Sequence, residues 1–389
     1  MNLLLFLAAL FLATYLLGRL LEKIRIPWVF SALLIGLGLA AYNPFFDITH
    51  SPSFTFLAEL GMFFLLFIIG FELNLHSIFK SSKFIVKTTY VMILAETIVG
   101  TFLVHYVFGV QWFISFLVSA SFATVGEEIL LPILEEFKLL KTKLGQTIMG
   151  IGVLDDVIEV LTVLIASVVI GNSLGYTQTN IWFNIFALVI IFGLFILFLQ
   201  YHKHLARFQY KDIPASFILV VFIIFLFVGL GRLAESAALG ALLAGITVRH
   251  IIPSRIINII ESEMKTLSYG FFAPIFFCWV GLDTDVAFLI KYPLLILLVM
   301  AMTNSTKILS SYLMGRKELG PKKSIIMGIS LSVKFSTSIV IIKLLFEKGL
   351  ITADLYSVLI GTTILFKFVI PFALAYLIPR WKIATSKNI

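Results

Sequence analysis

Charged residues are scarce in this chain. Asp, Glu, Lys and Arg together make up 13% of its 389 residues, whereas 60% are hydrophobic. The mean hydropathy of +1.07 is far above that of a water-soluble globular domain. A single cysteine, Cys278, excludes a framework of internal disulfides. No polar stretch is long enough for a separate domain, so the composition predicts an all-α integral membrane protein.

Apolar runs of spanning length recur along the chain and predict thirteen transmembrane helices. The first run lacks a basic leading region and a small-residue cleavage motif, so we interpret it as a retained span, not a signal peptide. Residues 1–389 are expected to form one transmembrane domain without a soluble regulatory domain. The predicted spans are 2–18, 28–43, 54–73, 84–108, 111–139, 145–170, 182–200, 214–231, 235–248, 268–287, 290–315, 322–346 and 352–378.

Positive charge is distributed unevenly between the predicted loops. Loops after odd-numbered spans carry two to four Lys or Arg residues each, whereas loops after even-numbered spans carry at most one. Because positively charged loops stay in the cytoplasm, the N-terminus is predicted outside and the C-terminus inside. The formal net charge of +8 therefore reflects topology. No nucleic-acid partner is expected, since no basic face with interleaved aromatic residues lies outside the membrane.

Thirteen spans also allow an inverted repeat. Six crossings return the chain to its starting side, so two six-span units joined by one linking span point in opposite directions. We expect residues 1–171 and 214–378 to form these units, with 182–200 as the linking helix. The fifth and twelfth spans occupy matching positions in the two units, and polar residues interrupt both of them.

Two adjacent aspartates, Asp155 and Asp156, lie in the middle of the apolar run 145–171. At about 1.5 Å of rise per helical residue, they lie roughly 15–17 Å from one end of that run and roughly 23–24 Å from the other, near the midplane of the bilayer. Each charged group there costs on the order of 2.5–3.5 kcal/mol on insertion scales. The pair is therefore predicted to be functional. Glu159, one helical turn further on, is expected to share its cavity.

The interrupted fifth and twelfth spans are predicted to be broken helices that cross. Broken helix ends expose free N–H and C=O groups that can hold an ion. A Ser/Thr-rich packing face is the alternative, but carboxylates and a lysine in the same breaks favour an ion site. Lys334 is a hypothetical partner of Glu127 or Glu128. The interrupting residues are Ser119, Ser121, Thr124, Gly126, Glu127 and Glu128 in one span, and Ser330, Ser332, Lys334, Ser336, Thr337 and Ser338 in the other.

Lys307 is predicted to lie at a depth similar to that of Asp155. Lys307 precedes Arg316 by nine residues, and Asp155 follows Lys143 by twelve. Both loops are predicted to be cytoplasmic, so both side chains lie roughly 13–18 Å from the same face. A buried lysine beside a buried aspartate lowers the energetic penalty of both. The alternative is that the lysine reaches the interface with its long side chain. Intramembrane charges without an assigned role are Glu59, Glu72, Glu96, Lys343 and Lys367.

Several segments resemble the monovalent cation:proton antiporter-2 family, most closely its bacterial sodium/proton antiporters with a double-aspartate motif. They follow the family order through almost the whole chain. These segments are LAELGMFFLLFIIGFELNL (57–75), ATVGEEILLPILEE (123–136), GVLDDVIEVL (152–161), LGALLAGITV (239–248), FFAPIFFCWVGLDTD (271–285) and the Lys307 region up to Gly315 and Arg316.

The resemblance implies that Asp156 alternately binds the cation and a proton, that Asp155 pairs with Lys307, and that Thr124 lies beside the ion. It further implies a homodimer in the bacterial inner membrane that exchanges Na⁺ (or Li⁺) for H⁺ by an elevator-like motion, without a cofactor. Some relatives have an aspartate directly after the threonine, where this chain has Val125.

Two alternatives to sodium/proton exchange stay open. One is a K⁺/H⁺ antiporter of the same architecture, and the other is a sodium-coupled symporter of an organic anion. An enzyme is not expected, because the sequence has no metal-ligand spacing, no glycine-rich phosphate loop and no nucleophile–base arrangement.

Overall fold

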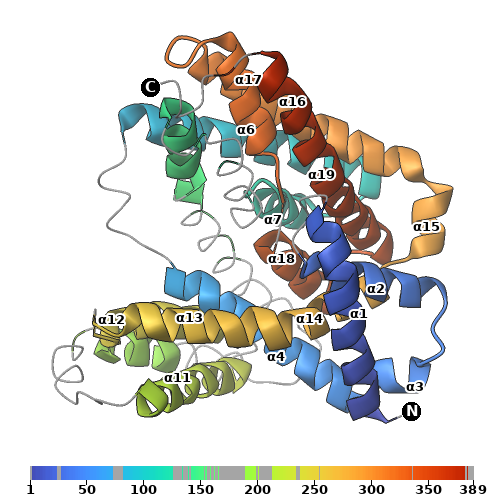
Figure 1. Cartoon of the computed structure of the whole chain (residues 1–389), viewed down its shortest axis with the longest axis vertical. Helices are drawn as coiled ribbons and strands as arrows, with labels where there is room; N and C mark the ends of the chain where they lie inside the picture. The colour runs from blue at the N-terminus through green and yellow to red at the C-terminus, as the bar shows by residue number, and fades with distance from the viewer. Residues whose placement is uncertain are drawn as a thin grey trace. The chain divides into compact units, whose positions relative to one another are not determined.

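The computed structural model describes residues 2–23, 28–72, 82–125, 134, 139, 142–152, 154–155, 158, 162, 165, 189–198, 200, 213–233, 237–253, 255–334, 336–381 and 383. All regular secondary structure in these residues is helical. Seven of the helical stretches are long and apolar enough to cross a membrane. The chain is thus an all-helical membrane protein, as the composition predicts (Figure 1).

The long helical stretches are α1 (Leu3–Lys23), α4 (Pro52–Glu72), α6 (Lys83–Phe108), α11 (Ile213–Leu233), α16 (Pro293–Gly315), α19 (Ala353–Arg380) and a continuous stretch made of α13 (Ile257–Leu267), the π-helix η1 (Ser268–Phe272) and α14 (Ala273–Leu282). The shorter helices are α2 (Phe30–Ala41), α3 (Phe46–Thr49), α7 (Trp112–Phe122), α12 (Ala237–Ile251), α15 (Val286–Lys291), α17 (Pro321–Ser330) and α18 (Ser336–Glu347). A further apolar helical segment is Val189–Phe198.

The tenth predicted span differs from the observed helix. The sequence predicts a span at 268–287, but the helical stretch begins at Ile257 and ends at Leu282. The sequence prediction assigns Lys265 to a charged loop, although it lies in this helix beside Glu261. In the structure these two residues form an ion pair at 2.9 Å, and Lys265 also pairs with Glu72 at 2.5 Å. Charged side chains that are paired in this way are compatible with the end of a membrane helix.

The chain forms two compact units. One contains Met1–Leu10, Phe45–Leu73 and Val160–Trp279, and the other contains Phe11–Pro44, Asn74–Glu159 and Val280–Ile389. Each unit therefore draws segments from both halves of the sequence.

Glycines bring helices close together in the first unit. A side-chain carbon at Gly70 of α4 would collide with the carbonyl oxygen of Leu242 on α12, and one at Gly245 of α12 would collide with the backbone of Phe67 on α4. Small residues allow membrane helices to pack with their backbones in near contact. The α4–α12 pair is therefore held by backbone shape as well as by its apolar side chains.

The second unit contains α6, α7 and α15–α19. Helix α16 packs against α6, α17 and α19, and α7 packs against α6 and α18. Helix α6 ends at Phe108, and the following Gly109 adopts a left-handed conformation (φ 67°) that glycine tolerates without strain. Helix α7 follows at once and returns along α6, so that Gly100 lies against Ser119. Glu96, one turn before Gly100, is thereby placed near the end of α7.

The twelfth predicted span is a broken helix in the structure. Helix α17 ends at Ser330, helix α18 begins at Ser336, and Ser332 and Lys334 lie in the non-helical segment between them. In the fifth predicted span, α7 ends at Phe122, and the next described residues are not helical. Both breaks fall where polar residues interrupt the apolar pattern.

Replacement of Gly245 by alanine tests the close approach of α4 and α12. We expect Gly245→Ala to lower the free energy of unfolding by about 1–3 kcal/mol, because the added carbon overpacks a backbone contact. The readout is the midpoint of thermal unfolding of the purified protein in detergent. Gly229→Ala on α11 is the matched control, because an added carbon there meets no atom within 4 Å. Equal midpoints for the two variants would contradict this account of the packing.

A candidate ion site where two broken helices meet

Four charged side chains gather in the interior of the second unit. They are Glu96 on α6, Asp155, Lys307 on α16 and Lys334 between α17 and α18, and each exposes at most 2% of its surface. An unpaired charge in such a place carries a desolvation penalty of several kcal/mol. The four side chains must therefore be compensated by one another or by the backbone.

Glu96 forms ion pairs with both lysines. Its Oε1 lies 2.7 Å from Nζ of Lys334, and its Oε2 lies 3.0 Å from Nζ of Lys307. One carboxylate thus faces two ammonium groups, and these three side chains carry a formal net charge of +1 when all are ionised. We call Glu96, Lys307 and Lys334 the buried triad.

The end of α7 provides the second partner of each lysine. Lys307 donates a hydrogen bond to the carbonyl oxygen of Ala123 at 2.6 Å, and Lys334 donates one to that of Thr124 at 3.3 Å. Carbonyl groups in the last turn of a helix lack intrahelical partners and carry partial negative charge. The broken helix therefore offsets part of the positive charge that Glu96 leaves uncompensated.

Asp155 is held by the next residue of the same break. The backbone N–H of Val125 donates a hydrogen bond to its Oδ2 at 2.6 Å. Its Oδ1 is buried and has no hydrogen-bond partner among the described residues. Lys307, Lys334 and Glu96 all lie close enough to Asp155 to interact with it electrostatically. This carboxylate thus has one oxygen fixed by the backbone and one oxygen open to a further ligand.

The two broken segments touch each other directly. The hydroxyl groups of Thr124, after α7, and of Ser338, in the first turn of α18, are hydrogen-bonded at 2.9 Å. Thr124 also donates to the carbonyl oxygen of Ser121 at 2.8 Å. Together with the contact of Lys334 to the same break, this hydrogen bond fixes the two breaks against one another.

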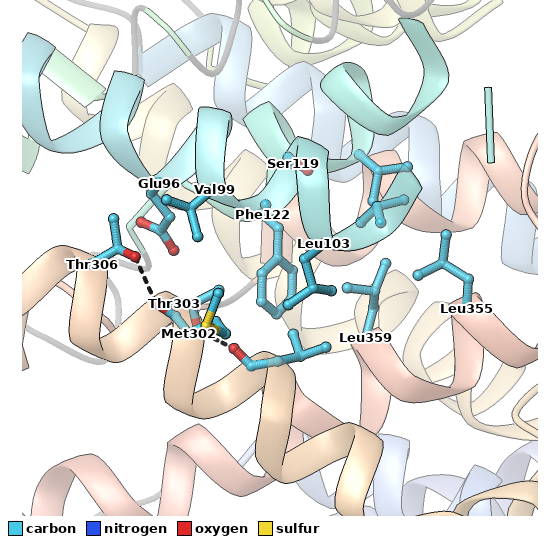
Figure 2. A pocket seen from close by; sticks show the side chains of 14 residues that line it. Glu96, Val99, Leu103, Ser119, Phe122, Met302, Thr303, Thr306, Leu355 and Leu359 are labelled. Carbon is cyan, nitrogen blue, oxygen red and sulfur yellow. Dashed lines mark hydrogen bonds between the residues drawn. The ribbon is translucent and has the colours of Figure 1, made fainter. Parts of the chain in front are cut away.

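A small cavity of about 20 Å³ lies beside the buried triad, between α6, α7, α16 and α19. Most of its lining is apolar, and Glu96 is its one charged residue in the part of the chain that the structure describes. Figure 2 shows Glu96 of α6 facing Thr306 and Thr303 of α16 across this space. The carboxylate that binds both lysines therefore lines this cavity.

The structure places several predicted site residues around the breaks. Thr124, Asp155, Lys307 and Lys334 are brought together as described above. Of the two predicted site serines of the twelfth span, Ser330 is the last residue of α17, and Ser332 lies in the break and donates to the carbonyl oxygen of Gly328 at 2.8 Å. The predicted site residues Asp156, Glu127, Glu128 and Glu159 lie outside the described residues.

The described contacts give both lysines a partner that the sequence did not predict. Lys307 pairs with Glu96, and no ion pair joins it to Asp155 among the described side chains. Lys334 also pairs with Glu96; its predicted partners Glu127 and Glu128 lie outside the described residues, so that pairing stays a prediction. The physical reason is the contact between α6 and α7, which brings Glu96 within reach of both ammonium groups.

The depth of Glu96 could have been estimated from the sequence. Glu96 follows Lys83 by thirteen residues, and Lys334 follows Lys323 by eleven. Counting residues from the cytoplasmic loops, which predicts a similar depth for Asp155 and Lys307, therefore predicts a similar depth for Glu96 and Lys334 as well. A depth count does not show which residues face each other, so the pairing itself required the structure.

The other intramembrane charges without an assigned role also have partners. Their burial therefore does not by itself indicate a second ion site. Glu59 pairs with Arg232, Glu72 with Lys265, Lys343 with Asp283 and Glu347, and Nζ of Lys367 lies 4.0 Å from the ring centre of Phe30.

Comparison with known proteins gives consistent matches. A family model described as "Sodium/hydrogen exchanger, transmembrane" matches residues 7–378. The chain is 24% identical over 374 residues to "Probable Na(+)/H(+) antiporter 3" of Methanocaldococcus jannaschii, with 93% of each protein covered. It is 25% identical over 368 residues to a Na(+)/H(+) antiporter of Enterococcus hirae, with 91% of this chain and 92% of the relative covered.

A potassium-efflux protein and a solved structure also match. The chain is 25% identical over 284 residues to KefC, a glutathione-regulated potassium-efflux system protein of Shigella flexneri, with 71% of this chain and 44% of KefC covered. The solved structure of the sodium proton antiporter MjNhaP1 from Methanocaldococcus jannaschii at pH 8 aligns with a TM-score of 0.64 and 16% identity, covering 98% of this chain and 96% of the other. At that identity the match supports the fold alone.

A double-mutant cycle tests the hydrogen bond between the two breaks. We expect Thr124→Val and Ser338→Ala to be coupled by about 0.5–1.5 kcal/mol in the free energy of unfolding in detergent, because either change removes the same buried bond. In the control cycle, Thr89→Val replaces Thr124→Val, since the Thr89 hydroxyl bonds within its own helix. Additive effects in both cycles would contradict a direct Thr124–Ser338 contact.

Proposed function

The chain belongs to the family of transmembrane sodium/hydrogen exchangers, and from that premise we propose that it exchanges Na⁺ (or Li⁺) for H⁺ across the bacterial inner membrane. The observation that carries the proposal is the buried group of opposite charges at the meeting point of two broken helices. Such a site can compensate a dehydrated cation, and its acidic groups can exchange protons with that cation. Exchange of this kind would serve pH homeostasis.

Asp156 is proposed as the carboxylate that alternately binds the cation and a proton. It is the neighbour of Asp155, whose carboxyl group is fully buried beside the break after α7. Two adjacent carboxyls in a low-dielectric cavity cannot both ionise freely. A cation binds when protons leave, and protons return when the cation leaves. Competition for one site thereby couples the two fluxes.

The neighbouring residues have supporting roles in this proposal. Thr124 lies beside the ion, and Lys307 compensates the charge of the aspartates. Six further residues are proposed to help shape the polar surroundings of the ion: Glu127, Glu128, Lys334, Glu159, Ser330 and Ser332. Support comes from the described contacts of Thr124 and both lysines, which place them at the same break as Asp155.

Alternating access is proposed to follow from the predicted symmetry. The proposed architecture has thirteen helices, with 1–171 and 214–378 as inverted repeats, 182–200 as the link, an outer N-terminus and a cytoplasmic C-terminus. Lys143 and Glu318 form an ion pair at 3.2 Å, which supports placing the two loops from which the depths of Asp155 and Lys307 were counted on one face.

Movement of the site is proposed to be elevator-like, within a homodimer. A site without cation or protons would carry uncompensated charge through the membrane, which disfavours leak. If Lys307 releases a proton together with Asp156, two protons move for each Na⁺ and exchange is electrogenic.

The role of Asp156 can be tested in everted membrane vesicles with a pH-sensitive dye. We expect Asp156→Asn to abolish Na⁺-dependent dequenching, because an amide can neither ionise nor carry the exchanged proton. Asp354→Asn is the matched control, because Asp354 is exposed in the first turn of α19 and should leave transport unchanged. Full activity of Asp156→Asn would refute the assignment.

A K⁺/H⁺ antiporter is the second candidate, and the match to KefC favours its consideration. The same vesicles separate the two functions when equal concentrations of Na⁺, Li⁺ and K⁺ are added. We expect dequenching with Na⁺ and Li⁺ and little with K⁺, because the chain matches two Na⁺/H⁺ antiporters over more than 90% of both lengths. A larger response to K⁺ than to Na⁺ would favour the alternative.

A further inference from the structure

We propose that Glu96 controls access of the cation to Asp155 by giving Lys307 a second acidic partner. The inference rests on the proposed cation exchange and adds a positioning residue to it. When the ammonium group of Lys307 is paired with Glu96, Asp155 is free to bind the cation. When Lys307 is paired with Asp155, the cation cannot bind to Asp155. The structure records the first arrangement.

The contacts of Lys307 define this open arrangement. Its Nζ lies 3.0 Å from Oε2 of Glu96 and 2.6 Å from the carbonyl oxygen of Ala123. An ammonium group has three N–H donors; one is donated to the carbonyl oxygen of Ala123, whereas the contact with Glu96 is an ion pair, because its Oε2 accepts no hydrogen bond among the described residues. Asp155 lies within electrostatic range of the same ammonium group. Lys307 therefore has two acidic groups near it and is bound to one of them.

The free oxygen of Asp155 is the place where the cation and Lys307 compete. Oδ1 is buried without a hydrogen-bond partner among the described residues, while Oδ2 is held by the N–H of Val125. A buried carboxylate oxygen without a partner is unfavourable. A metal cation, a proton or the ammonium of Lys307 can each fill that position, and the lysine excludes the cation when it does so.

Lys334 holds Glu96 in place for this exchange. It binds the other oxygen of Glu96 at 2.7 Å and the carbonyl oxygen of Thr124 at 3.3 Å. The carboxylate therefore keeps one partner when Lys307 leaves it. The transfer of Lys307 changes the position of a positive charge within the site and leaves the total charge of these four side chains constant.

Direct binding of Na⁺ to the purified protein, measured by isothermal titration calorimetry at alkaline pH, tests the proposal. We expect Glu96→Gln to weaken Na⁺ binding by about tenfold or more, because Lys307 then has Asp155 as its remaining acidic partner. An unchanged dissociation constant in this variant would overturn the inference.

Two double variants separate the position of Lys307 from net charge. Glu96→Gln/Lys307→Gln and Glu96→Gln/Lys334→Gln carry the same formal charge. We expect the first to restore binding to within about threefold of the wild type, an energy below 1 kcal/mol, because the competing lysine is gone. The second should stay weak. Equal recovery in both would indicate a net-charge effect, and recovery in neither would indicate a structural one; either result would overturn the proposal.

The wild type distinguishes this inference from the proposed function. If the wild-type protein shows no Na⁺ or K⁺ binding that protons displace, the proposed exchange fails. If the wild type binds one of these ions but the variants do not follow the expected order of affinities, the proposed role of Glu96 is refuted and the proposed exchange is not. The ion used in the titrations is the one that the wild type binds more tightly.

Folding of the variants is checked by size-exclusion chromatography. If Glu96→Gln does not give a monodisperse protein, Glu96→Asp is used in its place. The aspartate keeps the negative charge, but its shorter side chain cannot pair with both lysines equally well. We expect a smaller weakening of binding, relieved when Lys307→Gln is added and not when Lys334→Gln is added. Unchanged binding in Glu96→Asp would likewise count against the proposal.

Discussion

Two lysines buried side by side need a shared counter-ion, and the carboxylate of Glu96 meets that need. Removing one partner of a buried ion pair leaves an uncompensated charge and costs about 3–5 kcal/mol. The packing of α6 against α7 and α16 brings the carboxylate to the lysines. The candidate ion site therefore depends on the same helix contacts that hold the second unit together.

The break after α7 is the other half of this arrangement. Two consecutive carbonyl groups face the two lysines, and the next N–H faces Asp155. A continuous helix would use these groups for its own hydrogen bonds. Breaking the helix in the interior of the protein releases them for buried charges, and the contact between Thr124 and Ser338 supports the break from the second interrupted segment.

Composition and hydropathy predicted the fold class because a bilayer imposes strong constraints on helix length and polarity. Polar interruptions predicted the break in the twelfth span, and residue counting predicted a similar depth for Asp155 and Lys307. The partners of the lysines were not predictable in this way, because depth says nothing of the face of a helix on which a side chain lies. Glu96 and Asp155 were equivalent by depth, and the α6–α7 packing distinguishes them. The early start of the helix at Ile257 was missed because its charges are paired by residues distant in sequence, such as Glu72.

The use of main-chain atoms at Ala123, Thr124 and Val125 has a consequence for sequence variation. Peptide groups are the same for every residue type except proline, so three of the contacts to buried charges survive replacement of the side chains that follow α7. A valine can therefore occupy the position where some similar proteins have an aspartate, provided that a carboxylate reaches the lysines from another helix. In this chain Glu96 reaches them from α6, so the carboxylate that pairs with both lysines lies on a different helix from the break.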